Sequence, residues 1–196
     1  MTVTLAAGAR GVVVDERSVD GLGRITTSVL DPDADLDTIH AWVTAPGTGF
    51  WGLAELSREE LRDTYAFVDS LPTHHAYLLR CDGEPVALLQ VYDPADDPLG
   101  ECYDVQPGDV GIHVLVGARV RPGASGALFG GIAAFLGDLP GARRVVAEPD
   151  VRNDRALARM TRTGFVAGPV IDLPHKRAQL AFLPLPTTVP TTLETP

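Results

Sequence analysis

Three segments of the chain carry apolar residues at spacings of three and four, which is typical of a helix with one buried face. The first follows Asp35, a candidate cap, and ends before Pro46. The second begins at Ser57, where serine and Glu60 form a capping-box pattern, and the third begins after Gly126. The periodic positions are Leu36, Ile39 and Val43, then Leu61, Tyr65 and Val68, then Leu128, Ile132 and Phe135.

Other segments have the composition of strands. Residues 75–80 and 85–92 flank a turn that contains Asp82-Gly83, and residues 12–14 could start a strand nearer the N-terminus. Further strands are expected over 110–116, 143–148 and 178–183, with a helix over 154–163 and a proline- and acid-rich loop over 93–108. Helices ahead of a hairpin, followed by strand–helix–strand–helix–strand, predict a mixed α/β fold with helices on the sheet's faces.

Length and charge limit the classes of function. At 196 residues the chain fits one domain, which we place over residues 1–185, with a disordered tail over 186–196. A net charge of −10 argues against a nucleic-acid partner and mildly favours an amine substrate. Cys81, Cys102 and the five histidines match no metal-ligand spacing, so no metal is expected. With no apolar segment of membrane-spanning length in the sequence, we expect a cytoplasmic protein without a membrane partner.

Two residues could carry acid–base chemistry. Alternation along 110–116 places His113 on the face opposite Val110, Ile112 and Val114. A histidine in such a strand could take a proton from an amine, or be partly buried and bonded to the backbone. Asp150 follows a strand end, where it could orient an amine, act as a base, or support the turn before Asn153.

The 121–126 segment is a candidate phosphate cradle, because glycines there let backbone N–H groups approach an anion at the start of a helix. Asn153 reads first as a helix cap and could also touch a cofactor. Trp51, between glycines, is either a mobile aromatic wall or part of the core.

Taken together, these segments resemble the GNAT superfamily of acyl-CoA-dependent N-acyltransferases. More narrowly, they resemble its siderophore branch, the hydroxylysine N-acyltransferases of aerobactin and mycobactin type. The resemblance runs from about Phe50 to Phe182. Its main motifs are Phe50-Trp51-Gly52, Tyr92-Asp93, Asp109-Val-Gly-Ile-His113, Glu148-Pro-Asp150-Val-Arg-Asn153, Gly164-Phe165 and Leu173-Pro-His-Lys176-Arg-Ala178.

That resemblance implies a splayed, mostly antiparallel sheet with helices on both faces and acetyl-CoA or another acyl-CoA between two strands. His113 and Asp150 match the branch's acid–base and substrate-positioning pair. The implied cofactor contacts are Leu115, Val116, Arg121, Gly123, Ala124, Ser125, Gly126 and Asn153, and the implied substrate contacts are Trp51, Tyr92, Asp109 and Lys176. Ala124 stands where the superfamily has its first glycine, so a positive φ there would be strained.

The expected reaction is acyl transfer to the nitrogen of N6-hydroxylysine or a hydroxylated diamine, by direct attack on the thioester. Neither cysteine lies in a recognisable nucleophile setting, which argues against an acyl-enzyme. Two alternatives stay open: an aminoglycoside 6′-N-acetyltransferase, and an acyl-CoA-binding domain without turnover. The sequence also leaves open an acyl carrier protein as partner and a monomer or homodimer.

Overall fold

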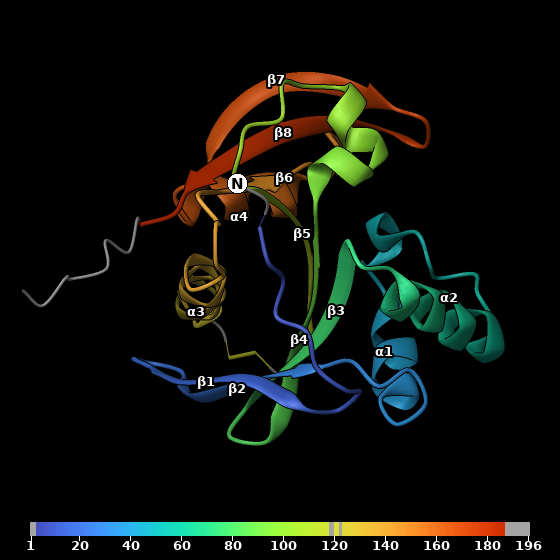
Figure 1. The fold of residues 1–196 in the computed structure, drawn as a ribbon. Coiled ribbons are helices and arrows are strands. Elements are labelled where there is room, and N and C mark those ends of the chain that lie inside the picture. The colour runs from blue at the N-terminus through green and yellow to red at the C-terminus, as the bar shows by residue number, and fades with distance from the viewer. Residues whose placement is uncertain (1–2, 118–119, 122, 187–196) are drawn as a thin grey trace, which may run out of the picture.

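The computed structural model describes residues 3–117, 120–121 and 123–186, so most of the expected tail lies outside the described residues. These residues form an eight-stranded mixed sheet with the order β1-β2-β3-β4-β5-β6-β8-β7 (Figure 1). The strands are β1 Val13–Val19, β2 Gly23–Val29, β3 His74–Cys81, β4 Glu84–Tyr92, β5 Asp109–Val116, β6 Arg144–Ala147, β7 Val166–Leu173 and β8 Lys176–Pro184. The helices are α1 Leu36–Val43, α2 Arg58–Ser70, α3 Ser125–Gly137 and α4 Asp154–Arg162, with 3₁₀ turns η1 Gly49–Trp51, η2 Pro94–Asp96 and η3 Pro98–Glu101.

The sheet opens between its two parallel neighbours, β5 and β6. Their pairing covers Asp109–Gly111 of β5, against residues 144–146 of β6, and goes no further. On its other side β5 is paired with β4 from Gly111 to Val116. Residues 112–116 therefore have one edge in the sheet and one edge facing a gap.

Helices cover both faces of the sheet (Figure 1). A large apolar cluster lies under α3 on one face and includes Val110, Ile112 and Phe135. A second cluster, on the face of α1 and α2, includes Tyr65 and Leu115. The alternation predicted for β5 is therefore confirmed, because neighbouring residues of this strand belong to different clusters.

Most predicted elements are present with small shifts at their ends. The Ser57–Glu60 capping box forms, and Asp82 and Gly83 both have positive φ in the β3–β4 turn, as a tight hairpin requires. Asp35 does not cap α1 with its side chain, which instead accepts hydrogen bonds from Arg80 and from the backbone of Asp31.

Strands β2 and β7 have no counterpart among the predicted elements. β2 reads Gly-Arg-Ile-Thr-Thr-Ser-Val, and two of its four buried positions are the polar residues Thr27 and Ser28. β7 is an edge strand in which Val166 and Val170 are exposed, and its register shifts between Ala167 and Val170. Neither strand has the regular apolar alternation that marks a half-buried strand.

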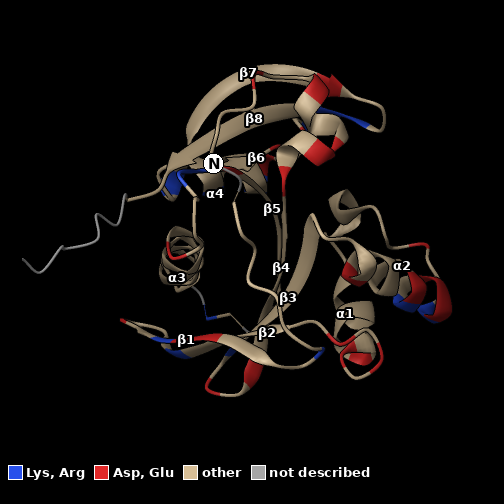
Figure 2. Cartoon of the chain, in the orientation of Figure 1, with Lys and Arg blue, Asp and Glu red and all other residues tan. Residues whose placement is uncertain are grey.

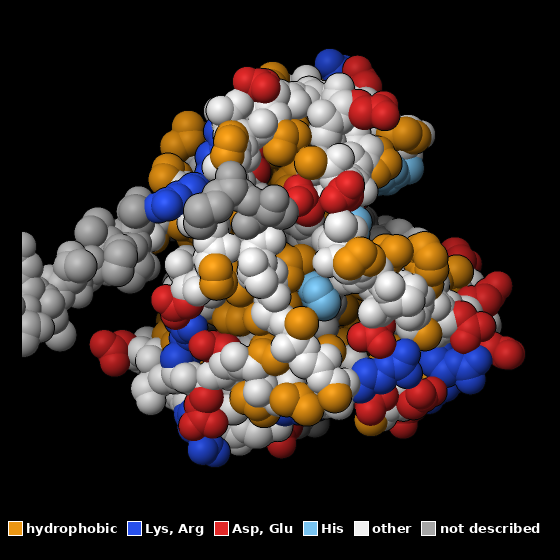
Figure 3. Space-filling model, viewed as in Figure 1, with side chains coloured by type: hydrophobic (Ala, Val, Ile, Leu, Met, Phe, Trp, Pro, Cys, Tyr) orange, Lys and Arg blue, Asp and Glu red, His pale blue; other side chains and the backbone are white. Residues whose placement is uncertain are grey.

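Charge is unevenly distributed over the fold. Acidic residues gather on the loop between β4 and β5 and on the outer side of α2, whereas basic residues are scattered (Figure 2). On the face seen in Figure 3, basic side chains lie directly beside acidic ones at the lower right. Ion pairs of this kind on α2 join Arg58 to Asp37 and Arg62 to Asp63. Within the described ranges, no helix is both long and apolar enough to cross a bilayer.

Candidate active site

The edge of β5 that faces the gap offers free backbone groups. Gly117 donates its N–H to the Val86 carbonyl of β4 at 2.8 Å. Since successive residues of an antiparallel strand direct their backbone groups to alternate sides, Val114 and Val116 turn theirs toward the gap and Leu115 turns its own toward β4. A ligand in the gap would therefore meet backbone groups of Val114 and Val116, and the side chain of Leu115 in place of the backbone groups expected for it.

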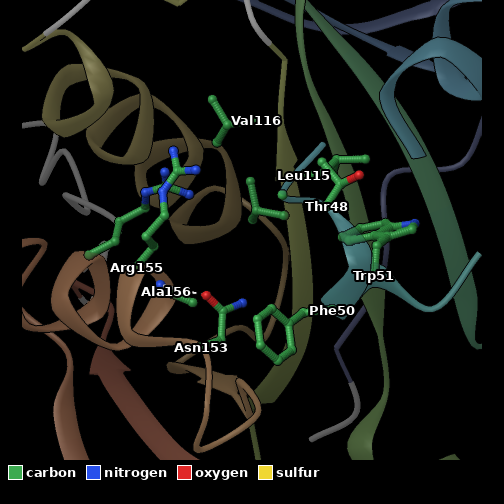
Figure 4. Close-up of a pocket in the computed structure, with 11 residues that line it drawn as sticks. Thr48, Phe50, Trp51, Leu115, Val116, Asn153, Arg155 and Ala156 are labelled. Atoms are coloured by element: carbon green, nitrogen blue, oxygen red, sulfur yellow. Dashed lines mark hydrogen bonds between the residues drawn. The ribbon is translucent and has the colours of Figure 1, made fainter. Parts of the chain in front are cut away.

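A cavity of about 160 Å³ opens at this gap, between β5, the η1 turn and the start of α4 (Figure 4). Leu115 lines it with its side chain, Asn153 and Phe50 lie across from it, and Thr48 and Trp51 flank it. A neighbouring cavity of about 570 Å³ shares the Gly47–Thr48, Val116 and Arg155–Arg159 sides and runs to the 121–125 turn. Together the two cavities make a groove from the gap to the start of α3.

At the gap, His113 meets a buried carboxylate. Its Nε2 lies 2.5 Å from Glu148 Oε1, and its Nδ1 lies 3.3 Å from Gln90 Oε1. The His113 side chain is 38% exposed, whereas that of Glu148 is 4% exposed. Because an ionised carboxylate only accepts hydrogen bonds, Nε2 carries a proton in this arrangement, and Nδ1 makes the longer contact.

Glu148 has two more partners from other strands. Tyr92 donates its hydroxyl to Oε2 at 3.0 Å, and Lys176 Nζ lies 3.2 Å from Oε1. Burial alone would raise the pKa of Glu148, but His113, Lys176 and Tyr92 outweigh it and lower that pKa to about 2. Burial, followed by the Glu148 charge, raises the pKa of Tyr92 well above its usual value. Glu148 is therefore an anion at neutral pH that holds His113 in place.

The ring of Tyr92 reaches Glu148 because Gly111 lies between them in the sheet. Tyr92 and Gly111 are paired across β4 and β5, and a Cβ at position 111 would overlap the Tyr92 ring. The ring also lies 5.2 Å from the His113 ring, centroid to centroid. A glycine at this position thus lets a β4 side chain cross β5 to the carboxylate after β6.

Asp150 occupies a different environment from the one we expected. Its carboxylate accepts from the backbone N–H of Arg152 at 2.8 Å and from the Arg152 guanidinium at 2.7 and 2.9 Å. These hydrogen bonds lower its pKa to about 2. Among the described residues no hydrogen bond or ion pair joins Asp150 to His113, so the carboxylate beside the histidine is Glu148. These contacts match the interpretation of Asp150 as a residue that supports the turn before Asn153.

The 121–126 turn is free of the strain that Ala124 could have introduced. Ala124 is the N-cap of α3 with φ −82°, and the positive φ falls on Gly123. Ala124 has no side-chain oxygen, so the first N–H groups of α3, at Ser125 and Gly126, lack a side-chain cap. Such a helix start suits an anion, and Arg121 and Ser125 line the larger cavity beside it.

The four expected substrate contacts divide into two groups. Tyr92 and Lys176 contact Glu148, and Trp51 lies edge-on to His113 at 6.3 Å while its indole N–H donates to Tyr65. Trp51 therefore lines the cavity and also packs on the core. Asp109 differs, because its side chain is 1% exposed and bound by Arg144, Tyr103 and the backbone of Gln106. We leave Asp109 out of the proposed substrate contacts.

Sequence reasoning missed four residues of the site. Glu148 and Gln90 contact His113, and Arg155 and Arg159 of α4 line both cavities. A signal existed for α4, since its arginines recur at helical spacing after the Asn153 cap, whose side chain accepts from Ala156 N at 3.1 Å. No local signal marked Gln90, whose partner lies on the neighbouring strand.

Several known proteins are similar to this chain. An Escherichia coli protein named N(6)-hydroxylysine O-acetyltransferase is 30% identical over 159 residues, which cover 78% of this chain and 49% of that protein. A lysine N-acyltransferase, MbtK, from Mycobacterium sp. (strain MCS) is 27% identical and is matched over 79% of this chain and 64% of its own length. The chain thus spans about half the length, or less, of the first curated relatives it matches.

Solved structures share the fold. An uncharacterised protein from Bacillus halodurans superposes with a TM-score of 0.80 at 20% identity, covering 89% of this chain and 91% of that one. AAC(6′)-Ib in complex with paromomycin and acetyl-CoA gives 0.73 at 20% identity, covering 87% of this chain and 99% of that one. Residues 31–173 match the family described as acetyltransferase (GNAT) domain. This chain belongs to the GNAT acetyltransferase family.

Proposed function

We propose that this protein transfers an acyl group from acyl-CoA to the nitrogen of a hydroxylated amine, such as N6-hydroxylysine or a hydroxylated diamine. The product is a hydroxamate of the kind used to chelate iron. One observation carries the proposal: a histidine held by a buried, ionised carboxylate lies where two strands separate in a GNAT fold. The names of the relatives, which include an N-hydroxyputrescine acetyltransferase from Acinetobacter baumannii, support the acceptor class.

The groove from the gap to the start of α3 suits an acyl-CoA in its chemical character. The uncapped N–H groups of α3 and the arginines at its mouth provide for phosphates, while Val114 and Val116 offer backbone groups in the gap. Acyl-CoA supplies the activated acyl group. Backbone N–H groups facing the gap would stabilise negative charge developing on the thioester oxygen.

His113 is the proposed base. Glu148 fixes Nε2 as the protonated nitrogen, as a carboxylate does in other carboxylate–histidine pairs. In the neutral ring Nδ1 then has the free lone pair, so it is the nitrogen that takes the proton once the acceptor replaces Gln90 beside it. The acceptor nitrogen forms the new C–N bond, the C–S bond breaks, and the proton lost by nitrogen passes to His113. Protonated His113 is stabilised by Glu148, and the proton can leave with the thiol.

The direct test is thiol release from acetyl-CoA with a panel of N6-hydroxylysine, hydroxycadaverine and kanamycin. We expect turnover with a hydroxylated amine, and a loss of about 10²–10⁴ in kcat for His113→Ala. The control is His75→Ala, because His75 lies on β3 against Tyr77, away from the gap. Near-normal turnover by His113→Ala would remove His113 from this role.

The same panel separates the alternatives. Turnover with kanamycin alone would indicate an aminoglycoside acetyltransferase, although the AAC(6′)-Ib structures, at 20% identity, support only the shared fold. A thermal shift with CoA and no thiol release with any acceptor would indicate a binding domain.

A further inference from the structure

Within the described part of the chain, the arginines of α4 form a set without carboxylate partners. Arg155, Arg159 and Arg162 recur at i, i+4 and i+7 on this nine-residue helix. Like charges at such spacings destabilise a helix, and this chain, with a net charge of −10, has carboxylates in excess to pair them. Yet among the described residues none of the three arginines has a carboxylate within ion-pair distance, in contrast to the arginines of α2.

Two of these arginines face the groove and the third does not. Arg155 and Arg159 line both cavities, and Arg155 Nη1 lies against Gly47 across the opening. Arg162, one turn further on, is exposed and lines neither cavity. Figure 4 shows Arg155 on the side of the cavity opposite Trp51, beside α4.

Arg159 carries the clearest sign of a missing partner. Its Nε is buried and has no hydrogen-bond partner among the described residues, and its guanidinium carbon lies 5.5 Å from the centre of the Phe129 ring. Burial, with the nearby charges of Arg155 and Arg162, lowers the pKa of Arg159. A buried donor without a partner is costly, and an anion in the groove would relieve both the desolvation and the repulsion.

We propose that Arg155 and Arg159 make this protein selective for free acyl-CoA over an acyl group carried on a carrier protein. The proposal rests on the proposed function. Both donors present the same pantetheine thioester to the gap, but CoA brings a diphosphate and a 3′-phosphate, whereas a carrier-bound arm brings one phosphodiester. The groove gathers Arg121, Arg155 and Arg159 at the end where those extra phosphates would lie.

Calorimetric affinities for CoA, dephospho-CoA and 4′-phosphopantetheine test this selectivity. We expect the wild-type protein to bind CoA about 100-fold more tightly than phosphopantetheine. Arg155→Gln and Arg159→Gln should each weaken CoA binding about tenfold, and more at low salt, while changing phosphopantetheine binding less than about twofold. Arg162→Gln is the matched control on the same helix and should behave as wild type.

Several outcomes would overturn the proposal. Equal binding of CoA and phosphopantetheine, equal losses in Arg155→Gln and Arg162→Gln, or faster turnover with an acetylated carrier protein than with acetyl-CoA would each do so. Arg159 packs on Phe129, so the melting temperature of Arg159→Gln is measured as well. If that variant unfolds, the test depends on Arg155→Gln, because Arg155 is exposed. Failure of every acceptor with intact, arginine-dependent CoA binding would refute the proposed function alone. Absence of CoA binding would refute both.

Discussion

The two ends of β5 differ in how their backbone is paired on the side of β6. At Asp109–Gly111 the strand pairs with β6, and the Asp109 carboxylate forms a two-point ion pair with Arg144 of β6 at 2.7 Å. From Ile112 to Val116 the β6 side is unpaired. The first end holds β5 and β6 together, and the second leaves backbone hydrogen-bonding groups free for a ligand.

The boundary between the two ends is where the candidate chemistry lies. Gly111 is the last residue of β5 paired with β6, His113 follows two positions later, and Glu148 follows β6 directly. Tyr92 crosses over Gly111 to the same carboxylate. Substitutions on either side of this boundary should therefore separate stability from activity.

After His113→Ala, the largest effect is expected from Glu148→Gln. The amide keeps the size of the side chain but loses the charge that orients His113 and stabilises it once protonated, so kcat should fall about 10²–10³-fold. Steady-state rates at saturating acetyl-CoA and acceptor measure this, with the KM for acetyl-CoA changing little.

Asp150→Asn is the control for Glu148→Gln, because it also neutralises a carboxylate after β6. Asp150 bonds to Arg152 and not to His113, so its variant should lose less than about tenfold in kcat. A larger loss of kcat in Asp150→Asn than in Glu148→Gln would instead support Asp150 as the carboxylate that acts with His113.

The sequence predicted more of the fold than of the site. Alternation in residues 110–116 was sufficient to place His113 on the face opposite Val110 and Ile112, because that signal is local. Glu148 was overlooked in favour of Asp150, since what distinguishes them is which side chains reach each one. Lys176 reaches Glu148 from 28 positions along the chain, on β8, and such a contact depends on strand order.

The same distinction applies to the phosphate end of the groove. The glycine-bearing turn before α3 was visible as a pattern, but its neighbour across the groove is α4, about 30 residues later. That Arg155 and Arg159 have no carboxylate partner among the residues the structure describes depends on packing, which no spacing rule reveals. Strand order and packing were thus needed to complete a site whose local pieces the sequence already indicated.

At the closed end, Asp109→Asn should reduce stability without abolishing ligand binding. It breaks a pair in which Asp109 is almost fully buried and Arg144 is 28% exposed, so we expect a loss of about 2–4 kcal/mol in the free energy of unfolding. Urea denaturation measures the loss, and calorimetry should show CoA affinity within about twofold of wild type. Asp15→Asn is a control at the β1 edge, where Asp15 is 17% exposed and its partner Arg17 keeps a second carboxylate, Asp138, so it should cost less than Asp109→Asn. A weak effect of Asp109→Asn would mean that β5 and β6 are held together by their backbone pairing alone.

Gly111→Ala tests the boundary itself and should destabilise the fold less than Asp109→Asn, by about 1–3 kcal/mol. The added methyl group would overlap the buried Tyr92 ring, which must move, and the Tyr92 hydroxyl would then leave Glu148.

Tyr92→Phe removes the same hydrogen bond without the overlap, so comparing the two variants separates steric displacement from loss of the bond. We expect Gly111→Ala to lower both the melting temperature and kcat, and Tyr92→Phe to lower kcat modestly with little change in melting temperature. Wild-type kcat in Gly111→Ala would show that the crossing of Tyr92 over β5 contributes only packing, and that Glu148 depends on His113 and Lys176 for its position.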